Sequence, residues 1–221
     1  MDTDRSRRGV RETYETIGAH FAKTREYAWP EVEAFVDDHG DRAVGTALDI
    51  GCGNGRHAEL LAGVAARVVA VDASRELLAV AGERVPECVA LVCGDASRLP
   101  VRGGVVGLAV YVATLHHLPT AEARRASLAE LARVLAPDGR ALVSVWSTAH
   151  DRFDAAADAD DGFDTTVDWT LPGGETVPRF YHIYAPAEFE RELADSPLRT
   201  VSFEVSSGNC YAVVESEGKG P

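Results

Sequence analysis

The stretch that most constrains this chain is residues 46–57, where a short apolar run passes into a glycine-rich turn. The run ends at Ile50 and is followed by three glycines at alternate positions, Gly51, Gly53 and Gly55. An apolar, alanine-rich segment comes next, so the order predicts a strand, a tight turn and a helix. Glycine tolerates positive φ and has no Cβ to keep a ligand away from the backbone, and a helix start presents free N–H groups. We therefore expect a small polar ligand to lie against this turn.

Two acids narrow the class of that ligand. Asp72 ends the next apolar run and follows Gly53 by 19 residues, close to the roughly 20 that separate a glycine turn from a ribose-binding acid. Its carboxylate suits a ribose diol, which indicates an adenosine-containing ligand. Asp49 precedes a G-x-G-x-G turn rather than G-x-G-x-x-G. An acid there would repel a pyrophosphate but attract the cationic amino-acid end of S-adenosylmethionine, which we predict as the cofactor. The alternative is an ordinary turn with Asp72 as a helix N-cap.

Apolar runs and helical spacings alternate along most of the chain. Strands are predicted at 47–50, 67–72, 88–93, 105–112 and 140–146, with helices at 56–63, 74–82 and 120–136 between them, followed by a helix at 186–194 and a hairpin of strands 200–206 and 209–215. Alternation implies a parallel sheet covered by helices on both faces, and the hairpin makes that sheet mixed. We predict one α/β, Rossmann-like domain over residues 1–221. The hairpin and the glycine spacing disfavour a nicotinamide-dependent oxidoreductase.

Two segments are expected to lie outside this framework. Residues 1–9 are polar and predicted to be disordered, before a helix over residues 10–22 that could cover the ligand. Residues 148–178 are rich in Asp and Ala and only weakly apolar. They are predicted to form a mobile, acidic surface insertion.

The charge balance is strongly acidic, with a net charge of −13 and only two lysines, Lys23 and Lys219. This composition favours a halophilic source, although a GC-rich gene in a mesophile would give a similar bias, and it argues against nucleic-acid binding. The chain has no 18-residue apolar run and no apolar segment after Met1, so we expect a cytoplasmic protein without a membrane span. The four cysteines form no C-x-x-C pair, and no metal site is predicted.

Several stretches together resemble one family, the tRNA wobble-uridine carboxymethyl methyltransferases, which are class I enzymes dependent on S-adenosylmethionine. They are residues 14–25 with Trp29-Pro30, 49–55, 115–118, 145–146 and 179–184. The resemblance implies methylation of the carboxylate of 5-carboxymethyluridine and a seven-stranded sheet of order 3-2-1-4-5-7-6. The acidic composition departs from the basic surface usual among members that act on RNA. A small-molecule O- or C-methyltransferase, or a non-catalytic scaffold of the same fold, remains an alternative.

The resemblance also implies which residues form the site. The cofactor pocket would be built from Tyr14, His20, Phe21, Arg25, Trp29, Asp49, Gly51, Cys52, Gly53, Asp72, Ala73, Asp95, Ala96, Val112, Leu115 and His116. Asp95 would contact the adenine amino group or cap a helix, and Arg25 could bind the cofactor carboxylate. Arg179 and His182 are the candidate catalytic residues, as donors to the substrate carboxylate. Their alternative roles are structural, Arg179 paired with a surface acid and His182 hydrogen-bonded in the core.

A carboxylate has an ordinary pKa near 4 and is already ionised at neutral pH, so the proposed reaction needs no general base. Bases of the tRNA anticodon loop would stack on Tyr181, Tyr184 and Trp169. The resemblance further implies a heterodimer with a small zinc-binding activator protein. The segment Val89, Ala90, Leu91 and Val92 supports this, because it is apolar on both faces and falls at a predicted sheet edge. The alternative is that another segment of the same chain covers this edge.

Overall fold

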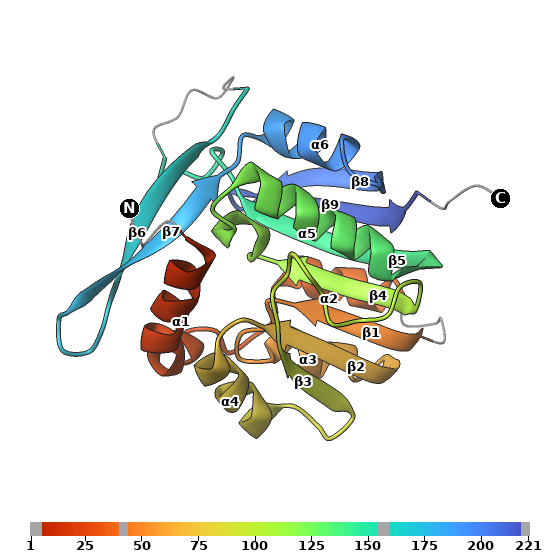
Figure 1. The fold of residues 1–221 in the computed structure, drawn as a ribbon, viewed down its shortest axis with the longest axis horizontal. Coiled ribbons are helices and arrows are strands. Elements are labelled where there is room, and N and C mark those ends of the chain that lie inside the picture. The colour runs from red at the N-terminus through yellow and green to blue at the C-terminus, as the bar shows by residue number, and fades with distance from the viewer. Residues whose placement is uncertain (1–5, 40–43, 154–159, 218–221) are drawn as a thin grey trace.

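The computed structural model describes residues 6–39, 44–153 and 160–217. Its elements, in chain order, are α1 (Arg7–Ala22), α2 (Pro30–Asp37), β1 (Val44–Ile50), α3 (Arg56–Leu61), β2 (Ala65–Asp72), α4 (Arg75–Arg84), β3 (Val89–Cys93), β4 (Val106–Val112), the 3-10 turn η2 (Leu115–His117), α5 (Ala121–Val134), β5 (Leu135–Trp146), β6 (Phe163–Thr170), β7 (Thr176–Ile183), α6 (Pro186–Ala194), β8 (Leu198–Ser206) and β9 (Asn209–Ser216) (Figure 1). No helix among these residues is both long and apolar enough to cross a membrane.

The main sheet has seven strands in the order β3-β2-β1-β4-β5-β9-β8. The strands from β3 to β5 run parallel, and β9 pairs antiparallel with both β5 and β8. This confirms the predicted fold and strand order, because β8 and β9 are the two strands of the predicted closing hairpin. The first strand, β1, lies at the centre between β2 and β4, so the glycine turn that follows it opens at the middle of the sheet's carboxyl edge.

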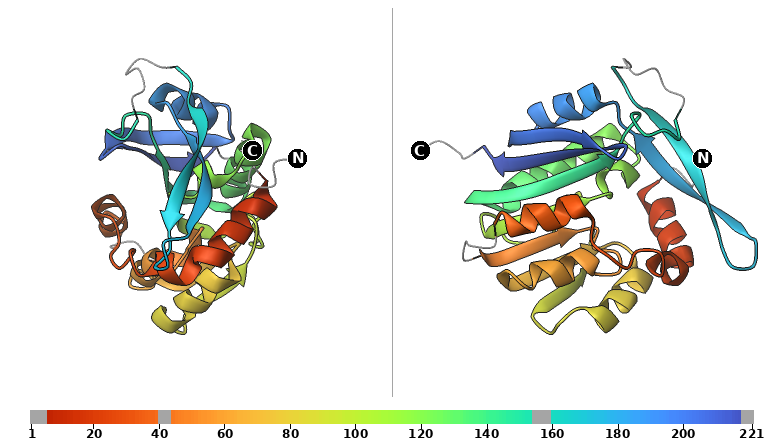
Figure 2. Two further views of the ribbon diagram at one scale, coloured as in Figure 1. Left: turned by 90° about the vertical axis from the view of Figure 1, so that its left-hand side faces the viewer. Right: turned by 180° about the vertical axis from the view of Figure 1, so that it is seen from behind.

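Helices cover both faces of this sheet. Helices α5 and α6 pack on one face, whereas α2 and α3 pack on the other, and Figure 2 shows α2 and α5 on opposite sides of the strands. In β4 the buried side chains alternate, with Leu108 and Val110 facing α2 and α3, and Ala109 and Tyr111 facing α5. A strand buried on both faces must be apolar throughout, which accounts for the unbroken apolar run at residues 105–112.

Strands β6 and β7 form a separate antiparallel hairpin that projects beyond the carboxyl edge, beside α1 (Figure 1). The predicted mobile insertion at residues 148–178 is therefore wrong where β6 and the start of β7 lie; its residues 154–159 fall outside the described residues. The acids of β6 sit on an exposed face. Asp164, Thr166 and Asp168 point outward, while Val167 and Trp169 alternate with them toward the protein. The alternation of inward and outward side chains along β6 could not be recognised in the sequence, because the inner face is only weakly apolar.

Disorder over residues 1–9 was also wrong for its described part, because α1 begins at Arg7. Ser6 caps the helix by accepting a hydrogen bond from the backbone N–H of Gly9 at 3.0 Å, as N-terminal serines commonly do. The first turn carries two arginines and a buried glycine, so its composition resembles a polar tail. Helix α1 crosses the carboxyl edge of the sheet and contacts both α4 and β7, which places it over the glycine turn.

Candidate active site

A cavity of about 870 Å³ opens at the carboxyl edge of the sheet, where ligands bind in open α/β folds. Its walls come from the turn after β1, the ends of β2, β3 and β4, the inner face of α1, and the hairpin β6–β7. This volume is at the upper end of the range found for small-molecule sites. The hairpin that the sequence pattern concealed is therefore one wall of the site.

The glycine turn forms the floor of the cavity, and its glycines have different roles. Gly51 has φ +71°, and a Cβ there would stand 2.1 Å from the side chain of Thr114, so packing as well as backbone conformation requires glycine. Gly53 has φ +53°, but apart from its own chain neighbours no described residue has an atom within 4 Å of the position its Cβ would take. It faces open space, as expected where a ligand approaches the backbone.

Asp72 is held by the same turn. Its Oδ2 accepts a hydrogen bond from the backbone N–H of Gly53 at 2.8 Å, and its Oδ1 accepts one from Ser74 N–H at 2.8 Å. Burial raises the pKa of the Asp72 carboxyl, and these backbone donors partly offset that effect. Each oxygen keeps a further lone pair. The carboxylate is thus fixed in orientation and can still accept from the two hydroxyls of a ribose.

Asp49 lies one residue before the cavity-lining Ile50 and is 1% exposed. Its Oδ2 has no hydrogen-bond partner among the described residues. Burial, together with the charge of Asp72, raises the Asp49 pKa to about 7, although Arg56 partly opposes the shift. A buried acceptor without a partner is costly, so an ionised Asp49 would be stabilised by a cationic ligand group placed close to the turn.

Most residues predicted for the cofactor pocket line this cavity. They are Tyr14, Phe21, Arg25, Trp29, Gly51, Cys52, Gly53, Asp72, Ala73, Asp95, Ala96, Val112 and His116. Three do not reach it. Asp49 lies behind the turn, Leu115 is fully buried in the core, and the His20 Nδ1 accepts a hydrogen bond from the Trp169 indole N–H at 3.0 Å. The side chains of His20 and Leu115 thus contact packing partners and do not line the cavity where cofactor contact was predicted.

Asp95 caps the turn after β3 and also borders the cavity, where the predicted contact with adenine would be made. Its Oδ1 accepts from the backbone N–H of Ser97 at 2.8 Å, as a turn cap does, while its Oδ2 forms an ion pair with Arg7 at 2.8 Å. The side chain also borders the cavity. Arg7 thereby joins the start of α1 to the turn after β3, a contact between residues far apart in the sequence that no local pattern revealed.

Arg179 of β7 enters the cavity as a buried cation without an acidic partner. Arg179 is 6% exposed and forms no ion pair with an Asp or Glu of the described residues. Its guanidinium carbon lies 5.0 Å from the ring centroid of Trp169, 5.2 Å from Tyr181 and 5.8 Å from Phe21. One N–H donates to the Tyr181 hydroxyl at 2.7 Å, whereas Nε has no partner. The predicted pairing with a surface acid is absent from the described structure.

Beside Arg179, a hydrogen-bonded chain fixes neutral groups on the cavity wall. His117 Nδ1 must donate to the carbonyl oxygen of Phe180 at 2.9 Å, so its Nε2 accepts from the Tyr14 hydroxyl at 2.9 Å. Burial lowers the His117 pKa to about 4 and the pKa of His116 well below its usual value. His116 Nδ1 accepts from Trp146 N–H at 2.9 Å, which leaves the proton on Nε2 as a neutral donor.

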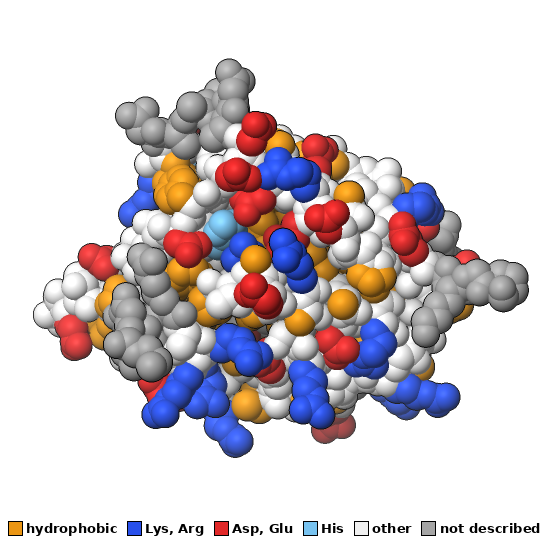
Figure 3. Space-filling view, turned by 45° about the horizontal axis from the view of Figure 1, so that its top comes forward, with side chains coloured by type: hydrophobic (Ala, Val, Ile, Leu, Met, Phe, Trp, Pro, Cys, Tyr) orange, Lys and Arg blue, Asp and Glu red, His pale blue; other side chains and the backbone are white. Residues whose placement is uncertain are grey.

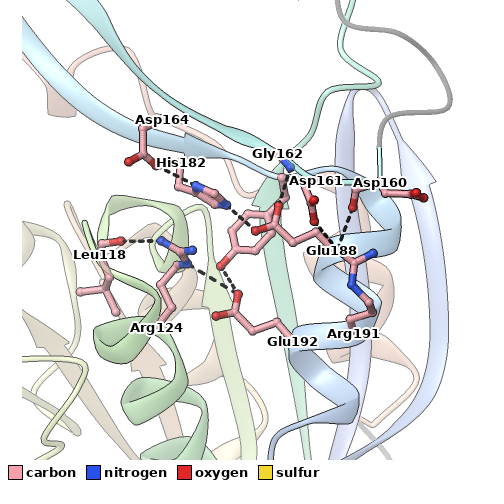
Figure 4. Close-up of polar contacts among 11 residues, drawn as sticks. Leu118, Arg124, Asp160, Asp161, Gly162, Asp164, His182, Glu188, Arg191 and Glu192 are labelled. Atoms are coloured by element: carbon pink, nitrogen blue, oxygen red, sulfur yellow. Dashed lines mark hydrogen bonds and ion pairs between the residues drawn. The ribbon is translucent and has the colours of Figure 1, made fainter.

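His182 lies elsewhere, in the polar network drawn in Figure 4. Its Nδ1 contacts Asp164 at 2.8 Å and its Nε2 contacts Glu188 at 2.9 Å. Carboxylates only accept, so this geometry requires a doubly protonated imidazolium or a protonated acid. His182 does not line the cavity. The structure thus places His182 in a hydrogen-bonded network away from the cavity, an arrangement that matches its structural alternative rather than a position at the substrate.

The same network removes Tyr184 from the predicted stacking residues. Tyr184 is fully buried and donates its hydroxyl proton to Glu192 at 2.6 Å. Glu192 also pairs with Arg124 at 3.6 Å. Arg124 lies on α5 and Glu192 on α6 (Figure 4), and Tyr184 directly follows β7, so these contacts fasten the base of the hairpin to the helices that cover the sheet.

Several cavity residues were missed by the sequence analysis. Asn54 lies inside the glycine motif, and its Nδ2 donates to the carbonyl oxygens of Ala22 and Arg25 at 3.2 and 2.7 Å, which holds the end of α1 on the turn. His57 also borders the cavity, and its pKa is lowered to about 3 by burial and nearby arginines. The position of Asn54 between two glycines was a usable signal. The remaining cavity residues that were not predicted are Arg7, Arg8, Val10, Arg11, Ile50, Arg56, Val71, Ser74, Leu77, Cys93, Gly94, Ala113, Thr114, His117, Leu118, Trp146, His150, Arg152, Val167 and Asn209.

The strand order, the glycine turn and the two acids around it are similar to those of class I S-adenosylmethionine-dependent methyltransferase domains. The residues present fit that cofactor, because Gly53 leaves open space, Asp72 keeps acceptors for a ribose and Asp49 has an unpartnered oxygen. In agreement, residues 48–143 match the family described as "Methyltransferase domain".

Two individual proteins show which methyltransferases this chain resembles in sequence. The tRNA (carboxymethyluridine(34)-5-O)-methyltransferase ALKBH8 of Macaca fascicularis is 38% identical over 138 residues, which are 62% of this chain and 20% of that protein. The Schizosaccharomyces pombe tRNA (carboxymethyluridine(34)-5-O)-methyltransferase is 28% identical over 215 residues, covering 89% of this chain and 90% of that protein. The chain thus spans only about a fifth of the first relative, and it resembles this group of tRNA methyltransferases.

Solved structures share the fold at lower identity. The DhpI–SAH complex has a TM-score of 0.70 at 20% identity, and the match covers 94% of this chain and 97% of the DhpI chain. A chain of the complex between the Haloferax volcanii Trm112 methyltransferase activator and a putative methyltransferase has a TM-score of 0.64 at 15% identity, covering 94% and 97%.

Proposed function

We propose that this chain is an enzyme that transfers a methyl group from S-adenosylmethionine to the carboxylate of 5-carboxymethyluridine at the tRNA wobble position, giving the methyl ester. The observation that carries the proposal is Arg179. A buried arginine without an acidic partner is unfavourable unless a ligand supplies the counter-charge. Its guanidinium can bind a carboxylate in two-point fashion, and the rings around it accommodate a flat base.

The residues of the cavity suit this chemistry because they bind and orient rather than transfer protons. The cofactor supplies an electrophilic methyl group, and the carboxylate oxygen forms the O–CH₃ bond as the S–CH₃ bond breaks, with no proton transferred. Arg179 would hold the carboxylate, with the His116 Nε2–H as a second donor. His116 and His117 are neutral at pH 7, so neither competes as a cation for the cofactor's charged groups. Aromatic walls exclude water from the reacting atoms, which favours the transfer.

A partner would occupy the edge strand β3. In the described structure β3 ends the sheet and pairs only with β2. Val89 is buried, Leu91 and Val92 are half-buried, and Ala90 is exposed, so the outer edge offers unblunted backbone groups. A small zinc-binding activator could add a strand there, and one structural neighbour comes from a complex with such an activator. The heterodimer would work in the cytoplasm, and the acidic surface suits a concentrated-salt interior.

The test is transfer of labelled methyl groups to bulk tRNA that contains carboxymethyluridine, with and without the activator, followed by nucleoside mass spectrometry. The expected product is the alkali-labile methyl ester of carboxymethyluridine. An enzyme that binds S-adenosylhomocysteine but leaves tRNA unlabelled would contradict the proposal. Transfer to a small carboxylic acid instead would assign the chain to the small-molecule methyltransferases.

A further inference from the structure

The cavity is bordered by arginines although the chain as a whole carries a net charge of −13. The acids on its border are Asp72 and Asp95, and the arginines there are Arg7, Arg8, Arg11, Arg25, Arg56, Arg152 and Arg179. The local charge is therefore opposite in sign to that of the protein. On the face drawn in Figure 3, several basic side chains gather along the lower margin, whereas the upper part carries most of the acidic ones with some basic ones among them.

Most of the cavity arginines have no acidic partner among the described residues. Only Arg7 and Arg8 of the seven form ion pairs with Asp or Glu there. Away from the cavity, such pairs engage six of the eleven described arginines, Arg84, Arg124, Arg133, Arg140, Arg191 and Arg199. The cavity therefore gathers five cations without described acidic partners at one opening, where an anionic ligand would supply the missing charge.

Two of the unpaired arginines are exposed and stand on different sides of the opening. Arg11 lies on α1, one helical turn after Arg7. Arg152 lies in the segment after β5 and has its guanidinium 5.9 Å from the ring centroid of Trp146. Both border the cavity, whereas Arg179 is at its buried wall. A ligand with a single carboxylate would engage Arg179 and leave the two outer cations without a partner.

We infer that Arg11 and Arg152 form a phosphate-binding rim that holds the RNA backbone on either side of the nucleotide whose base enters the cavity. The inference rests on the proposed function and specifies how an acidic protein would bind RNA. A single-stranded loop presents a splayed base together with flanking phosphates, which matches a deep aromatic pocket surrounded by exposed arginines. Backbone contacts of this kind position the substrate without reading its sequence.

The experiment measures binding of a fluorescent anticodon stem-loop RNA by anisotropy at KCl concentrations from about 0.1 to about 1 M. The double variant Arg11→Ala/Arg152→Ala is compared with the parent. Arg102→Ala is the matched control, because Arg102 is exposed, forms no ion pair with the described residues and precedes β4 at the opposite edge of the sheet. Arg11→Lys/Arg152→Lys keeps the charge and tests for a merely structural effect.

Each phosphate contact on a single strand contributes about 0.7 to the slope of log K against log salt. The alanine double variant should therefore lower the slope by about 1.4. The ratio of parent affinity to variant affinity should then be about 25-fold larger at 0.1 M KCl than at 1 M KCl. The lysine variant should regain most of this slope, and Arg102→Ala should match the parent. An unchanged slope in the alanine variant, or an equal loss in Arg102→Ala, would overturn the inference.

Two further arms separate the rim from the reaction. If the parent shows the arginine-dependent slope but never methylates carboxymethyluridine, the rim is supported and the proposed function fails. If anionic phospholipid vesicles bind the parent more tightly than RNA does, and lose that binding in the alanine variant, the rim serves lipid headgroups and the RNA assignment fails.

Discussion

The raised pKa of Asp49 makes a quantitative prediction about cofactor binding. In the free protein this carboxyl titrates near pH 7 because it is buried beside Asp72. A ligand ammonium is attracted only to the ionised form, so binding must release the proton, and the affinity must rise with pH. A carboxyl of pKa about 7 is about half ionised at pH 7 and about 1% ionised at pH 5. The expected loss is about 50-fold, or about 2.3 kcal/mol, whereas an ordinary Asp would give almost none over the same range.

Isothermal titration with S-adenosylhomocysteine between pH 5 and 7 measures this directly, because that ligand has the ammonium but no sulfonium. The amino group has an ordinary pKa of roughly 7.7–8.0 and stays protonated throughout this range. Asp49→Asn keeps the side-chain shape and removes the titration, so its affinity should be weaker at pH 7 and nearly constant down to pH 5. Equal pH dependence in the parent and the variant would refute the assignment to Asp49, as would a parent whose affinity does not change.

Three further predictions concern the edge strand, the buried network and the glycine turn. In the ladder between β2 and β3, Val68 N–H donates to the carbonyl oxygen of Cys88 and Gly94 N–H donates to that of Asp72. This register leaves the Leu91 N–H on the outer edge of β3. Leu91→Pro should therefore abolish activator binding in size-exclusion chromatography, and Leu91→Val should retain it. Arg124→Ala should lower the free energy of unfolding in urea by about 3–5 kcal/mol by leaving Glu192 unpaired, and Arg124→Met with Glu192→Leu should recover much of the loss; an additive double variant would contradict this. Gly51→Ala should reduce the melting temperature through its contact with Thr114, and a melting temperature equal to the parent's would show that the turn relaxes.

The sheet and the cofactor half of the site were predictable from sequence because they depend on local signals. Apolar runs followed by Gly51 and Asp72 mark strand ends, and in a parallel sheet those ends meet at one edge. The seven-strand order came from the resemblance together with the closing hairpin. Each of these features can be recognised within a few residues of the chain.

The substrate half was predictable only in part, because it depends on contacts between distant segments. Arg179 was identified, but the hairpin that presents it was concealed by acids on the outer face of β6. His182 appeared equivalent to Arg179 in the motif. The two residues are three positions apart on one strand, and side chains separated by an odd number of positions face opposite sides. His182 therefore contacts Asp164 and Glu188 instead. The arginines of α1 looked like a polar tail until the fold placed them at the cavity.

The measurement that tests the central claim most directly is the effect of Arg179→Ala on methyl transfer to tRNA and, separately, on the affinity for S-adenosylhomocysteine. A charge-assisted hydrogen bond contributes about 1.5–3 kcal/mol, so kcat/KM for tRNA should fall by about 10- to 150-fold while the cofactor Kd changes less than about twofold. Arg25→Ala removes the side chain predicted to bind the cofactor carboxylate and should show the reverse pattern. An Arg179→Ala enzyme that loses cofactor affinity as much as turnover, or that methylates tRNA at the parent's rate, would contradict the claim that this buried cation receives the substrate carboxylate.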